Sequence, residues 1–306
     1  MIDFSNDRNR IKAVVDILKK ISKKKKKFVH LHEPSLNHKD VLSVNKAITE
    51  KHVSSYGKYT SLFEKKLKKY TKSKNVVSTV NGTSALHISL ILANVKEQDE
   101  VIVSTLGFVS SVNVVSYLKA TPHFVDCEDI SLGIDPDKLE KYLTKNTILK
   151  NKNCINKKTK KIIKAIIVTH VFGYPCQIVK ILKVAKKFKI KLIEDSAECL
   201  GSWYKKKHLG TFGDFGVLSF NGNKIVTTGG GGAILTNNFK DALKALKLSK
   251  NMKIKKNYDQ IFDGVGYNYR LPSINAALGC SQIEKINFFL KKKENCTIYI
   301  KEILIN

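Results

Sequence analysis

Short apolar runs alternate along this chain with segments in which apolar residues recur at helical spacing. The apolar, often β-branched runs predict strands at 75–80, 100–105, 121–126, 164–170, 190–193, 215–220 and 233–236. The segments between them predict helices over 85–92, 108–118, 135–143, 177–188 and 240–248. Repeated β-α-β units of this kind predict an α/β fold with a mainly parallel central sheet and helices on both faces.

The ends of the chain carry further helical patterns. Ile11, Val14, Val15 and Leu18 recur at an amphipathic spacing, which predicts a helix over 8–22 that leans on the body. Other helices are predicted at 39–50, 61–70 and 273–289, and polar residues 144–160 are predicted to form a surface loop or a hairpin. We therefore expect an N-terminal helical extension (1–27), a large domain (28–250) and the start of a small C-terminal domain (251–306).

Polar residues follow several of the predicted strands directly. The triplet Gly82-Thr83-Ser84 follows one strand, His170 ends another, Asp195 ends a third, and Lys224 comes soon after a fourth. Ligands of parallel sheets bind beyond the carboxyl ends of the strands, so we expect these groups to lie close together.

The stretch from Gly213 to Gly232, GDFGVLSFNGNKIVTTGGGG, places Lys224 in a tight polar turn between a strand and a glycine-rich loop. A lysine in crowded, dry surroundings has a lowered pKa, and its neutral amine can bond covalently to an aldehyde. The hypothesis is that Lys224 holds pyridoxal phosphate (PLP). The alternative is one more surface lysine in a lysine-rich chain.

A PLP site also needs a phosphate cradle, a carboxylate facing the pyridine nitrogen and a flat group against the ring. The strand, glycine turn and helix start at Gly82-Thr83-Ser84 offer free backbone amides to a phosphate, although an ordinary helix cap has the same pattern. The other candidates are Asp195 for the pyridine nitrogen, Ser219 for the phosphate, Phe108 for stacking, and His170 for substrate or cofactor; each of them has a plain structural alternative.

The composition changes this interpretation little. The net charge of +29, from 55 basic and 26 acidic residues, is typical of nucleic-acid-binding proteins, but lysines spread over the whole chain fit an A/T-rich genome better. The six cysteines have a spacing that suits neither zinc nor a disulfide framework, so reduced thiols and no metal site are expected. No run of apolar residues is long enough to cross a membrane, and no secretory signal begins the chain, so a soluble cytoplasmic protein is expected.

Four motifs together resemble the DegT/DnrJ/StrS family of PLP-dependent sugar aminotransferases: NGTSALH, IEDSAECLGS, GDFGVLSFNGNKIVTTGGGG and GYNYRLPSINAALG. LHEPSL and HVSSYGKY near the start are most similar to the branch that serves legionaminic acid and related nonulosonic or amino-sugar pathways. The resemblance covers roughly residues 28–300 and implies the fold of PLP-dependent transferases of type I.

The resemblance implies a role for each matched residue. Lys224 matches the Schiff-base lysine, Asp195 the partner of the pyridinium, and Phe108 the stacking aromatic. Phosphate ligands are matched by Ser219 and by Thr83 and its neighbours, and Asn268 matches an asparagine that reaches the phosphate of the other subunit, which implies a homodimer with shared sites. Glu198 stands where many relatives have a glutamine near the cofactor hydroxyl.

The implied reaction moves an amino group from glutamate to a 4-keto-6-deoxy sugar carried on a nucleoside diphosphate, with Lys224 as acid and base. Relatives that perform 3-dehydration lack this lysine. Relatives also continue past Asn306, so a fragment, a truncated product or a divergent short form with impaired turnover is an alternative. A PLP transaminase acting on amino acids and a basic nucleic-acid-binding protein are competing hypotheses.

Overall fold

The computed structural model describes residues 7–22, 32–256 and 259–305. The strands are β1 (Asn75–Thr79), β2 (Glu100–Ser104), β3 (Thr121–Val125), β4 (Thr147–Lys150), β5 (Asn153–Asn156), β6 (Ile162–Thr169), β7 (Lys191–Asp195), β8 (Trp203–Tyr204), β9 (Lys207–His208), β10 (Phe215–Ser219), β11 (Gly232–Thr236), β12 (Lys253–Lys256) and β13 (Asp259–Phe262). The helices are α1 (Asp7–Ser22), α2 (His38–Thr49), α3 (Lys58–Thr71), α4 (Gly82–Leu92), α5 (Ser110–Tyr117), α6 (Pro136–Asn146), the 3₁₀ turn η1 (Val171–Gly173), α7 (Ile178–Lys187), α8 (Phe239–Ser249), α9 (Ser273–Glu284) and α10 (Ile286–Ile305).

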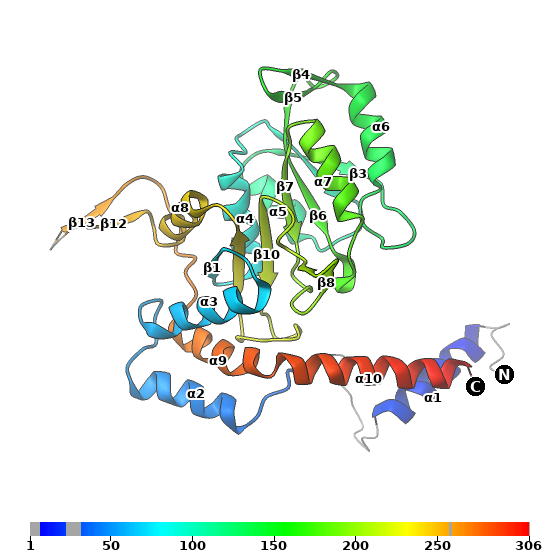
Figure 1. Cartoon of the computed structure of the whole chain (residues 1–306), viewed down its shortest axis with the longest axis vertical. Helices are drawn as coiled ribbons and strands as arrows, with labels where there is room; N and C mark the ends of the chain where they lie inside the picture. The colour runs from blue at the N-terminus through cyan, green and yellow to red at the C-terminus, as the bar shows by residue number, and fades with distance from the viewer. Residues whose placement is uncertain (1–6, 23–31, 257–258, 306) are drawn as a thin grey trace.

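The main sheet has the order β1-β11-β10-β7-β6-β2-β3 (Figure 1). The strands from β10 to β3 run parallel, as the sequence predicts, whereas β11 is antiparallel to both β1 and β10. The antiparallel pairing has a local cause: residues 220–231 join β10 to β11 without a helix, whereas parallel neighbours are usually joined by a crossover helix. The predicted mainly parallel sheet is therefore confirmed, with an antiparallel end.

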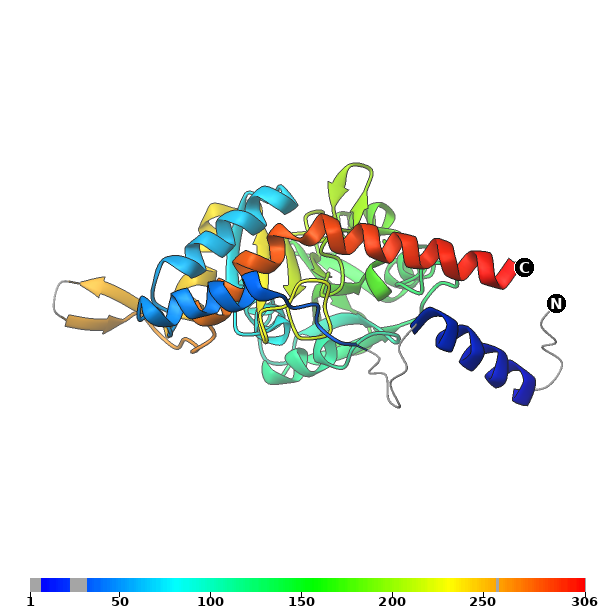
Figure 2. The same cartoon turned by 90° about the horizontal axis from the view of Figure 1, so that it is seen from below.

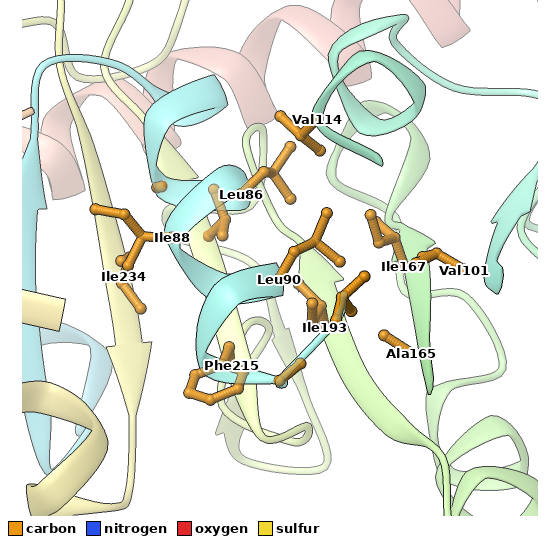
Figure 3. Packing of buried hydrophobic residues seen from close by; sticks show 14 of the residues in the cluster. Leu86, Ile88, Leu90, Val101, Val114, Ala165, Ile167, Ile193, Phe215 and Ile234 are labelled. Atoms are coloured by element: carbon orange, nitrogen blue, oxygen red, sulfur yellow. The ribbon is translucent and has the colours of Figure 1, made fainter. Parts of the chain in front are cut away.

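Helices cover both faces of this sheet. On one face, α4, α5 and α8 bury a cluster with the strands, and Figure 3 shows Leu86 and Leu90 of α4 between Val114 of α5 and Ile193 of β7. On the other face, α6 and α7 pack over β2, β6 and β7, while α3 and α9 pack over β10 and β11. Because side chains alternate along a strand, β2, β6, β7, β10 and β11 each contribute buried residues to both faces. This alternation also decides which polar groups share a face.

The helix α2 is bound to α9 rather than to the sheet (Figure 1). The buried carboxylate of Asp40 accepts hydrogen bonds from Ser281 at 2.7 Å, Gln282 at 3.0 Å and Lys285 at 2.5 Å. Since α9 also shares a buried cluster with α3, β10 and β11, the described part of 251–305 is continuous with the sheet region. The division at residue 250 stays a prediction.

The predicted N-terminal helix forms, but its apolar side chains do not pack as expected. It contacts α10, which runs from α9 toward the C-terminus (Figure 2). Ile11, Val14 and Leu18 are 64, 51 and 58% exposed, so the prediction that this stripe leans on the body is wrong for these side chains.

The polar segment 144–160 contains the β4–β5 hairpin, which extends the sheet along β6, so the hairpin alternative is confirmed. The β8–β9 and β12–β13 pairs were not predicted, because two- to four-residue strands carry too few positions for a period to be seen. Among the described helices, none is long and apolar enough to span a membrane.

Candidate active site

Strand alternation brings two predicted residues onto the same face of the sheet. In β7, Ile193 belongs to the cluster under α4 and α5, and Asp195, two positions on, points the same way. In β10, Phe215 and Val217 belong to that cluster, and Ser219 continues the series. Asp195 lies opposite Val217 in the β7–β10 pairing, so Ser219 stands two positions beyond it on the same face. Ser219 lies against the start of α4, and Asp195 is bonded to Ser111 near the start of α5.

Asp195 is 4% exposed and is held by neutral donors. Its Oδ2 accepts a hydrogen bond from Ser111 Oγ at 2.6 Å, and its Oδ1 accepts one from the Ala197 amide at 3.3 Å. Burial raises the pKa of Asp195, while these hydrogen bonds and the charge of Lys224 act against the rise. A buried carboxylate without an ion-pair contact is costly, so this site favours a cationic ligand group.

The start of α4 lies against Ser219. A Cβ built on Gly82 would stand 3.2 Å from the Ser219 Cβ, so the glycine permits this close approach. The Asn81 side chain caps the helix by accepting from the Ser84 amide at 2.7 Å. The amides of Gly82 and Thr83, first in the helix, have no intrahelical acceptor. The Ser84 amide is therefore used in an ordinary helix cap. The amides of Gly82 and Thr83, together with the Ser219 hydroxyl, are the groups that remain for the predicted anion site.

Lys224 lies in the predicted turn, where its amide donates to the Asn221 carbonyl at 3.0 Å. Its side chain is 17% exposed, and its Nζ donates to Glu198 Oε1 at 2.8 Å. The positive charge of Lys224 also lowers the pKa of the Asp195 carboxyl, by less than burial raises it. The lysine is thus confined rather than free on the surface.

Phe108 and Ser111 enter the site from the same turn. Phe108 lies in the connection from β2 to α5 and is 72% exposed, with a ring free to stack on a ligand. Its carbonyl accepts from the Ser111 amide at 3.1 Å, so one turn fixes both the aromatic ring and the donor to Asp195. Ser111 was not among the predicted site residues; its position three residues after Phe108 on a predicted helix was the available signal.

His170 faces away from these groups. Ala165 and Ile167 of β6 belong to the cluster under α4, whereas Ile166 and Val168 belong to the opposite one, so His170 follows the opposite face by parity. Its Nδ1 accepts from the Cys176 amide at 3.2 Å, which leaves Nε2 to donate to Glu194 at 3.0 Å. Both ring nitrogens are occupied, so the structural alternative for His170 is favoured and we leave it out of the proposed cofactor site.

The loop that carries Asn268 is anchored at Arg270. Asn268 is exposed and bridges to Lys250, and its predicted role in a shared site stays a prediction. Arg270 is buried, and its Nη1 donates to Glu64 at 2.5 Å and to the Ser78 carbonyl at 3.1 Å. Its Nε has no partner among the described residues, so the planar fork of this arginine is not used in full.

Comparison with known proteins supports a specific family. The family model for DegT/DnrJ/EryC1/StrS aminotransferases matches residues 34–306. The chain is 36% identical over 278 residues to the GDP-perosamine synthase of Escherichia coli O157:H7, which covers 90% of this chain and 72% of that protein. It is 32% identical over 271 residues to the UDP-4-amino-4,6-dideoxy-N-acetyl-beta-L-altrosamine transaminase of Campylobacter jejuni, covering 88% of this chain and 68% of that protein.

Solved structures give the same picture. PseC of Helicobacter pylori, an aminotransferase involved in the biosynthesis of pseudoaminic acid, superposes with a TM-score of 0.75 at 28% identity, over 85% of this chain and 66% of that chain. A sugar aminotransferase from Streptococcus pneumoniae in its PLP form gives a TM-score of 0.76 at 23% identity, over 87% of this chain and 69% of that chain, and shows the shared fold alone. The chain spans about two thirds of the length of these proteins.

The residues described above fit PLP. A phosphate matches the two uncapped amides of α4 beside Ser219, and a pyridinium matches the buried carboxylate of Asp195. An aldehyde matches the confined amine of Lys224. The type I fold expected from the resemblance agrees with the solved relatives, and PLP is the cofactor of this family.

Proposed function

Because this chain belongs to the DegT/DnrJ/EryC1/StrS aminotransferase family, we propose that it transfers an amino group from glutamate to a 4-keto-6-deoxy sugar linked to a nucleoside diphosphate. The observation that carries the proposal is the placement of Asp195 and Ser219 on one face of the sheet, with Lys224 in the turn beyond it. Sequence neighbours named for GDP-linked and UDP-linked sugars support a nucleotide-sugar substrate.

Each residue has a defined task in this proposal. PLP, when bound, supplies an aldehyde that takes up the amino group and a ring that accepts electrons. Gly82, Thr83 and Ser219 bind the phosphate, Asp195 keeps the ring nitrogen protonated, and Phe108 covers one face of the ring. Lys224 carries the proton between the substrate α-carbon and the cofactor during transfer, because it is the amine confined at the site.

Two finer assignments are also proposed. The similarity to PseC supports the nonulosonic-acid branch, whereas the perosamine synthase supports a GDP-linked sugar. A homodimer with shared sites, in which Asn268 reaches the partner's phosphate group, is proposed from the family resemblance and agrees with the exposure of Asn268. Light scattering of the purified protein tests the dimer, and amination assays with GDP-, UDP- and dTDP-linked keto sugars separate the branches.

The test of the central proposal is an absorbance spectrum of the protein with PLP, followed by borohydride reduction and peptide mapping. Wild type should give an adduct on Lys224 that glutamate converts to the amino form of the cofactor. Lys224→Ala should give neither, while Lys187→Ala, which removes an exposed ion-paired lysine, should behave as wild type. Identical spectra for wild type and Lys224→Ala would exclude the proposed role.

A further inference from the structure

Within the described residues, the side-chain amine of Lys224 makes its direct polar contact with Glu198. The Lys224 Nζ lies 2.8 Å from Glu198 Oε1, and the two side chains are 17 and 39% exposed. The lysine is therefore buried more deeply than its partner.

The backbone of Glu198 is held from two sides. The turn after β7 begins with a hydrogen bond from the Ser196 amide to the Val217 carbonyl of β10, at 2.9 Å. On the other side, Gly173 has a φ of +80°, and a Cβ added there would stand 2.8 Å from the Glu198 carbonyl oxygen. Packing therefore fixes the backbone that carries the Glu198 carboxylate. In this respect Glu198 differs from a residue in an exposed ion pair on a helix surface.

The other charged groups nearby have different partners. Asp195 accepts from Ser111 and Ala197, and Glu194 accepts from His170 and from backbone amides on the opposite face. Lys224 therefore has one carboxylate in contact and one, Asp195, acting through space. This arrangement gives Glu198 a role that depends on the charge state of the lysine.

We propose that Glu198 is the docking partner of Lys224 in the cofactor-free protein, holding its ammonium until the lysine nitrogen bonds to the cofactor. The proposal rests on the proposed function. When the bond forms, the ammonium gives a proton to solvent, and the amine nitrogen bonds to the aldehyde carbon. The aldehyde oxygen then leaves as water with the two remaining Nζ hydrogens. When substrate displaces the lysine, Nζ is released as a neutral amine that is free to take the α-carbon proton. Glu198 touches neither substrate nor cofactor in this scheme and acts through Lys224, which makes it a positioning residue.

The ion pair and the covalent bond compete for one nitrogen, so removing the carboxylate should favour the bond. The experiment titrates the cofactor-free full chain with PLP between pH 5 and 10, following the adduct by absorbance and by borohydride trapping mapped to Lys224. In Glu198→Gln the equilibrium constant for the adduct below its pH midpoint should rise roughly three- to tenfold, moving the midpoint to lower pH.

Matched variants separate this role from a structural one. Glu198→Asp keeps a carboxylate and should stay near wild type, and Glu140→Gln breaks the exposed pair with Lys187, at 2.7 Å, and should change nothing. A midpoint that does not move in Glu198→Gln, or that moves to higher pH, overturns the proposal, as does a fall in unfolding temperature without a shift of the midpoint. If wild type gives no adduct at Lys224, the proposed function itself fails.

Discussion

At the scale of single residues, Glu194 and Asp195 show how two adjacent carboxylates acquire different chemistry. They point to opposite faces of β7. Glu194 accepts from the amides of Gly210, Phe212 and Gly213 at 2.9, 2.6 and 2.7 Å and from His170, whereas Asp195 has neutral donors and a charge acting at a distance. The Glu194 carboxylate has its hydrogen-bonding positions filled and serves the structure. The Asp195 carboxylate has fewer donors and can still accept a hydrogen bond from a ligand.

We expect Glu194→Gln to destabilise the protein by about 3 kcal/mol at neutral pH, because the amide NH₂ would face donors. Burial alone would raise the pKa of Glu194, but His170 and the backbone amides lower it. A lowered pKa contributes stability above the usual Glu pKa that is lost as pH falls through the folded value. Urea unfolding at several pH values should therefore show the difference shrinking in acid; a constant difference would contradict this account.

Asp195→Asn should have the opposite effect on stability. Burial raises the pKa of Asp195, so its contribution to stability is present below the usual Asp pKa and lost as pH rises through the folded value. At pH 7 the cofactor-free Asn variant should be more stable by about 1 kcal/mol and bind PLP at least tenfold more weakly. Thermal unfolding and an absorbance titration measure the two quantities, and a less stable variant at pH 7 would argue against a strained carboxylate.

Residue types and spacing predicted most of this site but not its orientations. Asp195, Ser219 and the start of α4 lie at one edge of the sheet, since they follow strands that end there, and the role of Lys224 beside them stays a prediction. His170 follows such a strand too, but the alternation of side chains along β6 places it on the opposite face, where it bonds to Glu194. Counting positions from the buried residues of β6 would have revealed this. The spacing of Ser111 from Phe108 was a signal for its position, but its contact with Asp195 depends on the docking of α5.

At the scale of elements, close backbone approach decides which glycines matter. A Cβ on Gly216 of β10 would come 1.9 Å from the Gly210 carbonyl oxygen, whereas one on Gly222 would meet nothing within 4 Å. The two positions offer a matched pair near Lys224, one packed against backbone and one open.

We expect Gly216→Ala to lower the free energy of unfolding by about 3 kcal/mol or more, since the obstructing atom belongs to backbone and cannot rotate away. Gly222→Ala should change it by less than about 0.5 kcal/mol. Urea denaturation of both variants provides the comparison, and equal stabilities would show that β10 can shift from the loop without cost.

The elements themselves followed from periodicity where they were long. The helix predicted over 135–143 forms over 136–146, with Pro136 as its first residue and Asp135 accepting from two amides of its first turn. The antiparallel placement of β11 was not predicted, because strand direction depends on the connection and not on the residues of the strand.

At the scale of the whole molecule, Asp40 joins α2 to side chains of α9 that lie 241 and 242 residues away in the sequence. Burial would raise the pKa of Asp40, but its bonds to Lys285, Ser281 and Gln282 lower it. We expect Asp40→Ala to cost about 3 kcal/mol and to expose α2 to proteolysis before the sheet region is cleaved. Limited proteolysis with mass mapping measures this order; simultaneous cleavage would mean that α2 and the sheet unfold together.

The order β1-β11-β10 also has a kinetic consequence. Residues 75–79 reach the sheet only through residues 232–236, which are separated from them by most of the large domain. Pairing over such a separation closes slowly. The amides that follow β1 therefore meet the serine at the end of β10 only late in folding. A chain interrupted before residue 232 would contain Lys224, Asp195 and Glu198 but not β11. The amides of Gly82 and Thr83 would then not be brought against Ser219, and the proposed phosphate site would not form.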